Sequence, residues 1–160
     1  MMSFLVRILI AIGAILSFFW FMNFNSAKDE EANFNVIREC INHINLGLHI
    51  HPHLEIVISG ERQIIPANIG IESANCMRPV HTHDISGTLH IEWKRPRDFV
   101  LADFFKVWTR TFNQNQILDS VVDENHEIIL TVNGEQSEEY ENQIMRDGDR
   151  IVIMYQEKQK

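Results

Sequence analysis

The chain has 160 residues, of which 45% are hydrophobic and 22% charged, and its formal net charge is −8. This composition is typical of a globular protein and excludes a disordered chain. The acidic balance argues against nucleic acid as a partner, because phosphate binding requires a basic face. The length also excludes a barrel-type metallohydrolase, which needs roughly 200 residues or more.

The amino-terminal region predicts a membrane-spanning helix. Residues 8–27 contain no charged side chain, and a helix of this length spans about 30 Å, the thickness of a bilayer's hydrocarbon core. Arg7 precedes this segment and acidic residues follow it, so the positive-inside rule places the amino terminus in the cytoplasm.

We therefore expect a single-pass membrane protein with four parts. They are a cytoplasmic amino terminus at 1–7, a transmembrane signal-anchor at 8–27, a polar stalk at 28–34 and an extracytoplasmic domain, periplasmic or on the cell surface, at 35–160. A cleaved signal peptide is the alternative, and it would export the same domain.

Cys40 and Cys76 are the two cysteines of the chain. In an oxidising compartment an even pair predicts a disulfide. A pair of thiolate ligands or redox cysteines is the alternative, although the chain has no C-x-x-C spacing.

The segment 35–46 has apolar residues at a weak helical spacing, which predicts a short helix. From Leu48 to Ile58 the pattern changes to alternation, which predicts one strand with apolar side chains on one face. The polar face of this strand carries His49, His51, His53 and Glu55.

Short elements are expected after this strand. Gly60 marks a turn and residues 62–66 a return strand. Residues 67–80 have no regular pattern. Residues 88–93 predict a second strand, with Thr88, His90 and Glu92 opposite its apolar face.

The segment 97–113 gives the clearest helical pattern, with Asp98 as a plausible cap near its start. Its apolar stripe consists of Leu101, Phe104, Phe105, Trp108 and Phe112. Such a stripe is typical of a helix face that packs on a core.

The remaining residues predict strands at 126–132 and 150–155, with turns at Asn133-Gly134 and Asp147-Gly148. The fold class predicted is therefore α+β, a small mixed sheet with one amphipathic helix packed across it. The ending VNGEQSEEYENQIMRDGDRIVIMY resembles the close of ubiquitin-like β-grasp domains of the sulfur-carrier type. The Gly-Gly terminus of those carriers is absent, so sulfur or ubiquitin-type conjugation is not implied.

Six of the eight histidines fall in two blocks, His49-x-His51-x-His53 and His81-x-His83 with His90. An H-x-H pair on a strand places two imidazoles on one face, and two pairs on adjacent segments supply four nitrogen ligands. The candidate metal ligands are His49, His51, His53, His81, His83 and His90. Asp84, Glu92 and Glu55 are nearby carboxylates that can orient a ring through its other nitrogen.

Two known metal motifs match only in part. The H-T-H sequence is similar to the H-[ST]-H-P motif of JAMM metalloproteases, but Asp84 replaces the proline and no S-x-x-D follows. His49, His51 and Glu55 have the spacing of the first cupin motif, but the flanking glycines and the second histidine motif are absent.

The ordered blocks resemble an uncharacterised family of exported or membrane-anchored bacterial and archaeal proteins. That family carries H-x-H-x-x-L, I-P-A-x-I-G-I and H-T-H-D-x-S-G-x-x-H-x-E in this order, and the match covers about residues 40–108. The matching positions are His51, His53, His81, His83, Asp84, His90 and Glu92. The resemblance implies an extracytoplasmic location and a histidine-rich site, with no established reaction.

Three interpretations of the histidines remain open: a metal site, a hydrogen-bonded polar network, and a surface cluster that senses pH. Imidazole ligands outside the cytoplasm favour copper or zinc as the ion. The leading hypothesis is a membrane-anchored metal-binding module for metal capture, delivery or sensing. A small metalloenzyme, with a metal-bound water and Asp84 or Glu92 as base, and a partner-binding β-grasp subunit of a membrane complex are the alternatives.

Overall fold

The computed structural model describes residues 16–17, 20, 34–41, 43–73 and 75–158. Residues Val36–Lys160 form one compact unit and Met1–Asn35 another. Most of the predicted signal-anchor at 8–27 lies outside the described residues. Among the residues that are described, no helix is both long enough and apolar enough to cross a bilayer.

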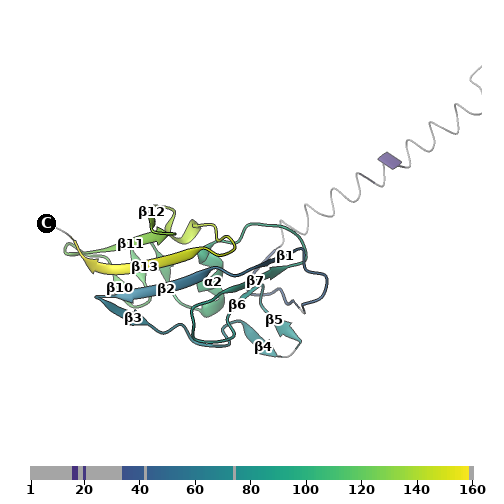
Figure 1. Cartoon of the computed structure of the whole chain (residues 1–160), viewed down its shortest axis with the longest axis horizontal. Coiled ribbons are helices and arrows are strands. Elements are labelled where there is room, and N and C mark those ends of the chain that lie inside the picture. The colour runs from purple at the N-terminus through teal and green to yellow at the C-terminus, as the bar shows by residue number, and fades with distance from the viewer. Residues whose placement is uncertain (1–15, 18–19, 21–33, 42, 74, 159–160) are drawn as a thin grey trace, which may run out of the picture. The chain divides into compact units, whose positions relative to one another are not determined.

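The largest sheet has five strands in the order β12-β11-β13-β2-β3 (Figure 1). The two central strands, β2 (His53–Ile58) and β13 (Arg150–Glu157), run parallel, and every other pair in this sheet is antiparallel. The outer strands are β3 (Glu61–Gln63), β11 (His126–Val132) and β12 (Glu135–Ser137).

Strand β11 has the bounds that the sequence predicts, and β13 extends two residues beyond its prediction. The turn between β11 and β12 has positive φ at both Asn133 and Gly134, 55° and 89°, which is the conformation that an Asn-Gly hairpin turn adopts.

A second sheet has three antiparallel strands in the order β1-β7-β6. They are β1 (Leu48–Ile50), β7 (His90–Trp93) and β6 (Val80–His81). Smaller pairings join β4 (Ile71–Ser73) to β5 (Cys76–Met77), and β8 (Phe112–Asn113), β9 (Gln116–Ile117) and β10 (Ser120–Val121) to one another.

The single strand predicted from Leu48 to Ile58 is wrong, because it is divided at Pro52 into β1 and β2, which belong to different sheets. Proline has no N–H to donate to a ladder, so the strand pairing ends there. The carbonyl oxygen of Pro52 instead accepts a bond of 2.9 Å from the Leu89 N–H.

The helix α2 (Leu101–Trp108) is shorter than the predicted 97–113. It ends at Trp108, because the next residue, Thr109, has a left-handed φ of 57°. Phe112 of the predicted stripe lies in β8. Asp98 is not its cap. The Asp103 carboxylate accepts the Val100 N–H at 3.1 Å, whereas Asp98 pairs with Arg146.

The buried face of α2 consists of Leu101, Phe104 and Phe105, and it packs against β6, β8 and the 3-10 turn η1 (Tyr140–Asn142). Gly70 permits a close approach here: a side chain at this position would meet Val107 Cγ1 at 2.8 Å and Val80 O at 2.9 Å. This packing fixes β6, which carries part of the histidine cluster.

Two further sequence predictions are wrong. The described residues of 35–46 contain a turn at 36–38 and an isolated bridge at Ile41 instead of a helix. Positive φ values of 57° at His43 and Asn45 are incompatible with a continuous helix there. The stretch 67–80, expected to be irregular, contains β4, β5 and the start of β6.

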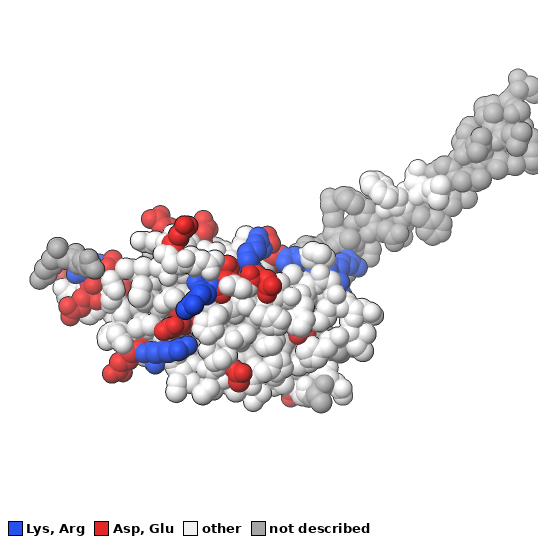
Figure 2. Space-filling model, viewed as in Figure 1, with Lys and Arg blue, Asp and Glu red and all other residues white. Residues whose placement is uncertain are grey.

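The α+β class is confirmed. Figure 2 shows acidic and basic side chains interspersed over the five-stranded sheet, and a broad area with few charged residues over the end formed by β4, β6 and β7. The histidine-bearing strands β6 and β7 lie at that end.

Candidate metal centre

The three-stranded sheet brings the histidine blocks together. Strand β7 is central, and its His90 pairs with His81 of β6, while Glu92 pairs with His49 of β1. Because side chains on a strand alternate, His90 and Glu92 project from the same face of β7. His51 follows β1 directly and His83 follows β6, so both H-x-H pairs flank His90.

The first group of rings consists of His81, His83 and His90. One nitrogen from each ring lies within 4.8 Å of the others. His81 Nε2 and His83 Nε2 are 3.2 Å apart. Two nitrogens on one tetrahedral zinc ion lie about 3.3 Å apart, because each Zn–N bond is about 2.0–2.1 Å long. These two atoms therefore already have the separation that a shared ion requires.

The His81 ring is fixed in one tautomer. Its Nδ1–H donates to the Arg78 carbonyl oxygen at 2.9 Å, which leaves the lone pair on Nε2. The residue is fully buried. Burial lowers the pKa of His81 from 6.5 to about 4, and the neighbouring His83 and His90 add to this effect. At neutral pH His81 thus presents an unprotonated nitrogen, as a metal ligand must.

Because His81 Nε2 carries no proton, His83 Nε2–H donates the bond that joins the two rings. Burial is also the first cause that lowers the pKa of His90, followed by the charges of His83 and His51. The lowered pKa values of His81 and His90 both favour the neutral form of the ring, which is the form that binds a metal ion.

Thr82 holds the H-T-H segment in place. Its buried hydroxyl donates to Pro66 O at 2.8 Å and accepts from the Ile69 N–H at 3.1 Å. Its backbone N–H and C=O bond to Ile69 and Asn68. The I-P-A-N-I-G-I block thereby anchors the residue between the two ligands, which fixes the directions of both rings.

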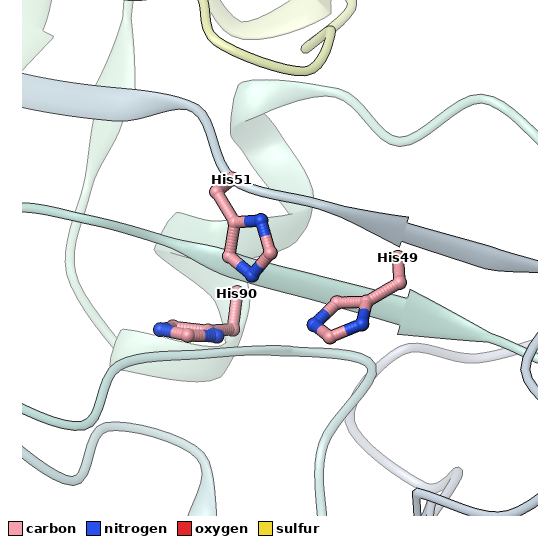
Figure 3. Close-up of side chains that lie close together, drawn as sticks. All are labelled: His49, His51 and His90. Atoms are coloured by element: carbon pink, nitrogen blue, oxygen red, sulfur yellow. The ribbon is translucent and has the colours of Figure 1, made fainter.

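The second group of rings consists of His49, His51 and His90, again with one nitrogen each within 4.8 Å (Figure 3). The His51 ring centre lies 4.6 Å from that of His49 and 4.8 Å from that of His90. His51 also donates its backbone N–H to the Asp147 carboxylate at 2.8 Å. The two groups thus share the central ring, His90.

Glu92 projects from the same face of β7 as His90 and is buried, with 1% of its side chain exposed. His49 Nε2 lies 3.1 Å from Oε1, and His43 Nδ1 lies 2.6 Å from Oε2. The second contact is close but not aligned as a hydrogen bond, so Oε2 has no hydrogen-bond partner among the described residues. Glu92 is thus a buried carboxylate in direct contact with the histidine cluster.

Three predicted site residues lie elsewhere or make other contacts. His53 belongs to β2 in the five-stranded sheet and falls in neither group, because the break at Pro52 separates it from His51. Glu55 lies 3.8 Å from Arg62. The exposed Asp84 accepts the Ser86 N–H at 2.8 Å. Hydrogen bonding with the side chain and then the backbone of Ser86, with lesser effects from His90 and His83, lowers the pKa of the Asp84 carboxyl.

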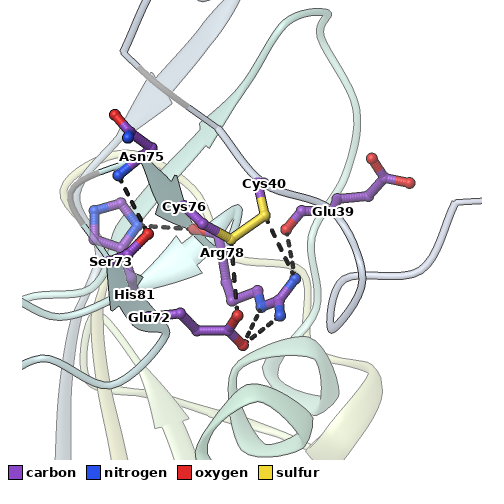
Figure 4. The surroundings of a disulfide bond; sticks show 8 residues. All are labelled: Glu39, Cys40, Glu72, Ser73, Asn75, Cys76, Arg78 and His81. Atoms are coloured by element: carbon purple, nitrogen blue, oxygen red, sulfur yellow. Dashed lines mark hydrogen bonds and ion pairs between the residues drawn. A yellow bond between two sulfur atoms is a disulfide. The ribbon is translucent and has the colours of Figure 1, made fainter.

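The predicted disulfide Cys40–Cys76 is present and joins the segment before β1 to β5 (Figure 4). Arg78 lies beside it. The guanidinium bonds to the Glu72 carboxylate and donates to the Glu39 carbonyl oxygen at 3.1 Å. The disulfide and Arg78 together hold the backbone whose carbonyl accepts the His81 N–H.

Sequence reasoning assigned no role to His43, Thr82 or Arg78. Thr82 was visible within the H-T-H block, but the contribution of Arg78 comes through its backbone carbonyl, which no side-chain pattern reveals. His43, which has a positive φ of 57°, contacts Glu92 through its Nδ1, and no sequence pattern indicated this contact.

No protein-family model, curated protein or solved structure matches this chain.

Proposed function

We propose that the domain is a metal-binding module whose primary ligands are His81, His83 and His90. The observation that carries this proposal is the pair of Nε2 atoms 3.2 Å apart, one of them buried and held without a proton. Three imidazoles leave at least one coordination position for a fourth ligand, such as water or a donor from a partner.

Imidazole ligands suit zinc and copper, and we propose one of these as the ion. Metal capture, delivery or sensing on the outer side of a membrane is the role that fits the proposed signal-anchor, and the disulfide is compatible with that compartment. The parallel pair of central strands, each with an antiparallel neighbour, supports a β-grasp arrangement.

A structural network is the competing function for the same rings. The His83-to-His81 hydrogen bond favours it, since this contact satisfies both nitrogens without an ion. In that case the domain would act by binding a protein partner in the membrane or periplasm.

Metal affinity distinguishes the metal-binding module from the structural network. The full chain, purified in mild detergent without a histidine tag, should bind Zn²⁺ or Cu²⁺ in equilibrium dialysis, and His81→Ala with His83→Ala should lose the tight equivalent. His126→Ala serves as control, because that ring stacks on Tyr155 instead, at 5.1 Å. Wild-type protein that binds neither ion would contradict the proposal and favour the network.

A further inference from the structure

The central ring of the cluster belongs to both groups of histidines. Resting on the proposed function, we propose that this face binds two divalent ions, one in each group, and that the His90 ring bridges them through its two nitrogens.

The distances place His90 between the two H-x-H pairs. Its ring centre lies 4.5 Å from His83 and 5.5 Å from His81 on the β6 side. On the β1 side it lies 4.8 Å from His51 and 6.5 Å from His49. His90 is the ring that both groups contain.

The two H-x-H pairs fall in separate groups of close nitrogens, and His90 is the member that the groups share. Strands β1 and β6 flank β7 on opposite sides, so the pairs approach His90 from opposite sides. Each pair binds its own ion in this arrangement, and His90 supplies the third ligand to both because an imidazole ring has two nitrogens.

The bridging step conserves charge. A neutral His90 ring bound to one ion through one nitrogen releases the proton of the other nitrogen to solvent, and the lone pair left there binds the second ion. The bridge is thus an imidazolate of charge −1, which lies between the two positive ions and reduces their repulsion.

Carboxylates are present on both sides of the bridge. Glu92 is buried next to His49, and its Oε2 has no hydrogen-bond partner among the described residues. Asp147 Oδ1 lies 3.8 Å from His51 Nδ1. Asp84, although exposed, lies close enough to His83 and His90 to interact electrostatically with both. A second cation would thus meet negative charge on either side.

Stoichiometry tests the proposal in the full chain, using Cu²⁺ as the probe. Wild-type protein should bind two equivalents. The variant His49→Ala with His51→Ala should bind one equivalent, at the His81 and His83 group. The variant His81→Ala with His83→Ala should also bind one, at the His49 and His51 group. His90→Gln should weaken both sites by at least about tenfold, since each loses a direct ligand, a greater loss than that of an outer hydrogen-bond partner. His126→Ala should retain two equivalents.

Electron paramagnetic resonance distinguishes a shared ring from two independent sites. The first equivalent of Cu²⁺ should give a full signal, and the second should reduce the intensity per ion because a bridging ring couples the two spins. Additive signals, or a His90→Gln variant that loses one equivalent and keeps the other unchanged, would overturn the bridge.

If the wild type binds a single equivalent of Cu²⁺, the proposal of a second ion is wrong and the proposed function stands. No binding at all would overturn both. The paired alanine variants retain His90, so the count of ions tests the proposal even where His90→Gln fails to fold, as checked by circular dichroism.

Discussion

The titration of His81 gives a quantitative test of how this site is built. Its pKa is lowered from 6.5 to about 4, and burial is the main cause. In the unfolded chain the ring is exposed and takes up a proton as the pH falls through 6.5, whereas in the folded protein it stays neutral until about pH 4. The unfolded state therefore binds more protons between these values, and stability falls as the pH is lowered.

The size of the effect follows from the shift. Each unit is about 1.4 kcal/mol, so His81 should remove about 3 kcal/mol of unfolding free energy between pH 7 and pH 4, and little more below that. The His81→Gln variant has no such titration. At pH 7 the variant should have a lower unfolding free energy than the wild type, and this deficit should be about 3 kcal/mol smaller at pH 4.

The measurement is urea unfolding of a chain that starts at Phe34, with chelator present, at several pH values between 7 and 4. Subtracting the unfolding free energy of the variant from that of the wild type removes the contribution of the carboxylates, because both chains contain them. His126→Gln, which changes a ring stacked on Tyr155, controls for the loss of a histidine as such. If the difference in unfolding free energy between wild type and variant is the same at pH 7 and pH 4, His81 is not buried in its neutral state.

Three further predictions concern the scaffold. Replacing Cys40 and Cys76 together with Ser should lower the unfolding free energy by about 4 kcal/mol, because the disulfide closes a loop over a separation of 36 residues; an unchanged urea midpoint would contradict this. Gly87→Ala should destabilise far more than Gly134→Ala: both have φ near +90°, but an added Cβ lies 2.4 Å from a backbone oxygen at Gly87 and meets nothing within 4 Å at Gly134. Equal melting temperatures for these two variants would show that the close approach is absent. Phe104→Ala should cost about 3–5 kcal/mol, since this side chain is fully buried, and a loss below about 1 kcal/mol would place it outside the core.

Local patterns were sufficient to predict the elements that form from nearby residues. The alternation of β11 and its Asn133-Gly134 turn, and the apolar stripe that begins α2 at Leu101, are determined within a few residues of chain. The register of His81 with His90 was not predicted, but both histidine blocks and Glu92 were identified from their spacing.

The wrong predictions have one physical cause. Pairing between residues far apart in the sequence determined the local conformation. Alternation continues through Pro52, yet the missing N–H and the competing partners of β1 and β2 divide the strand between two sheets. His53 was assigned to the site because a continuous strand would have placed it on the same face as His51. The disulfide partner and the Ile41–Met77 bridge likewise replace the expected helix at 35–46.

The most direct test of the metal site is a crystal structure of the domain grown with Zn²⁺ and measured at the zinc absorption edge. The proposed site should give an anomalous peak about 2.0–2.1 Å from His81 Nε2, His83 Nε2 and one nitrogen of His90, with the His81 Nδ1–H still donating to the Arg78 carbonyl. A structure with no zinc at these three rings, and with the His83-to-His81 hydrogen bond retained, would contradict it.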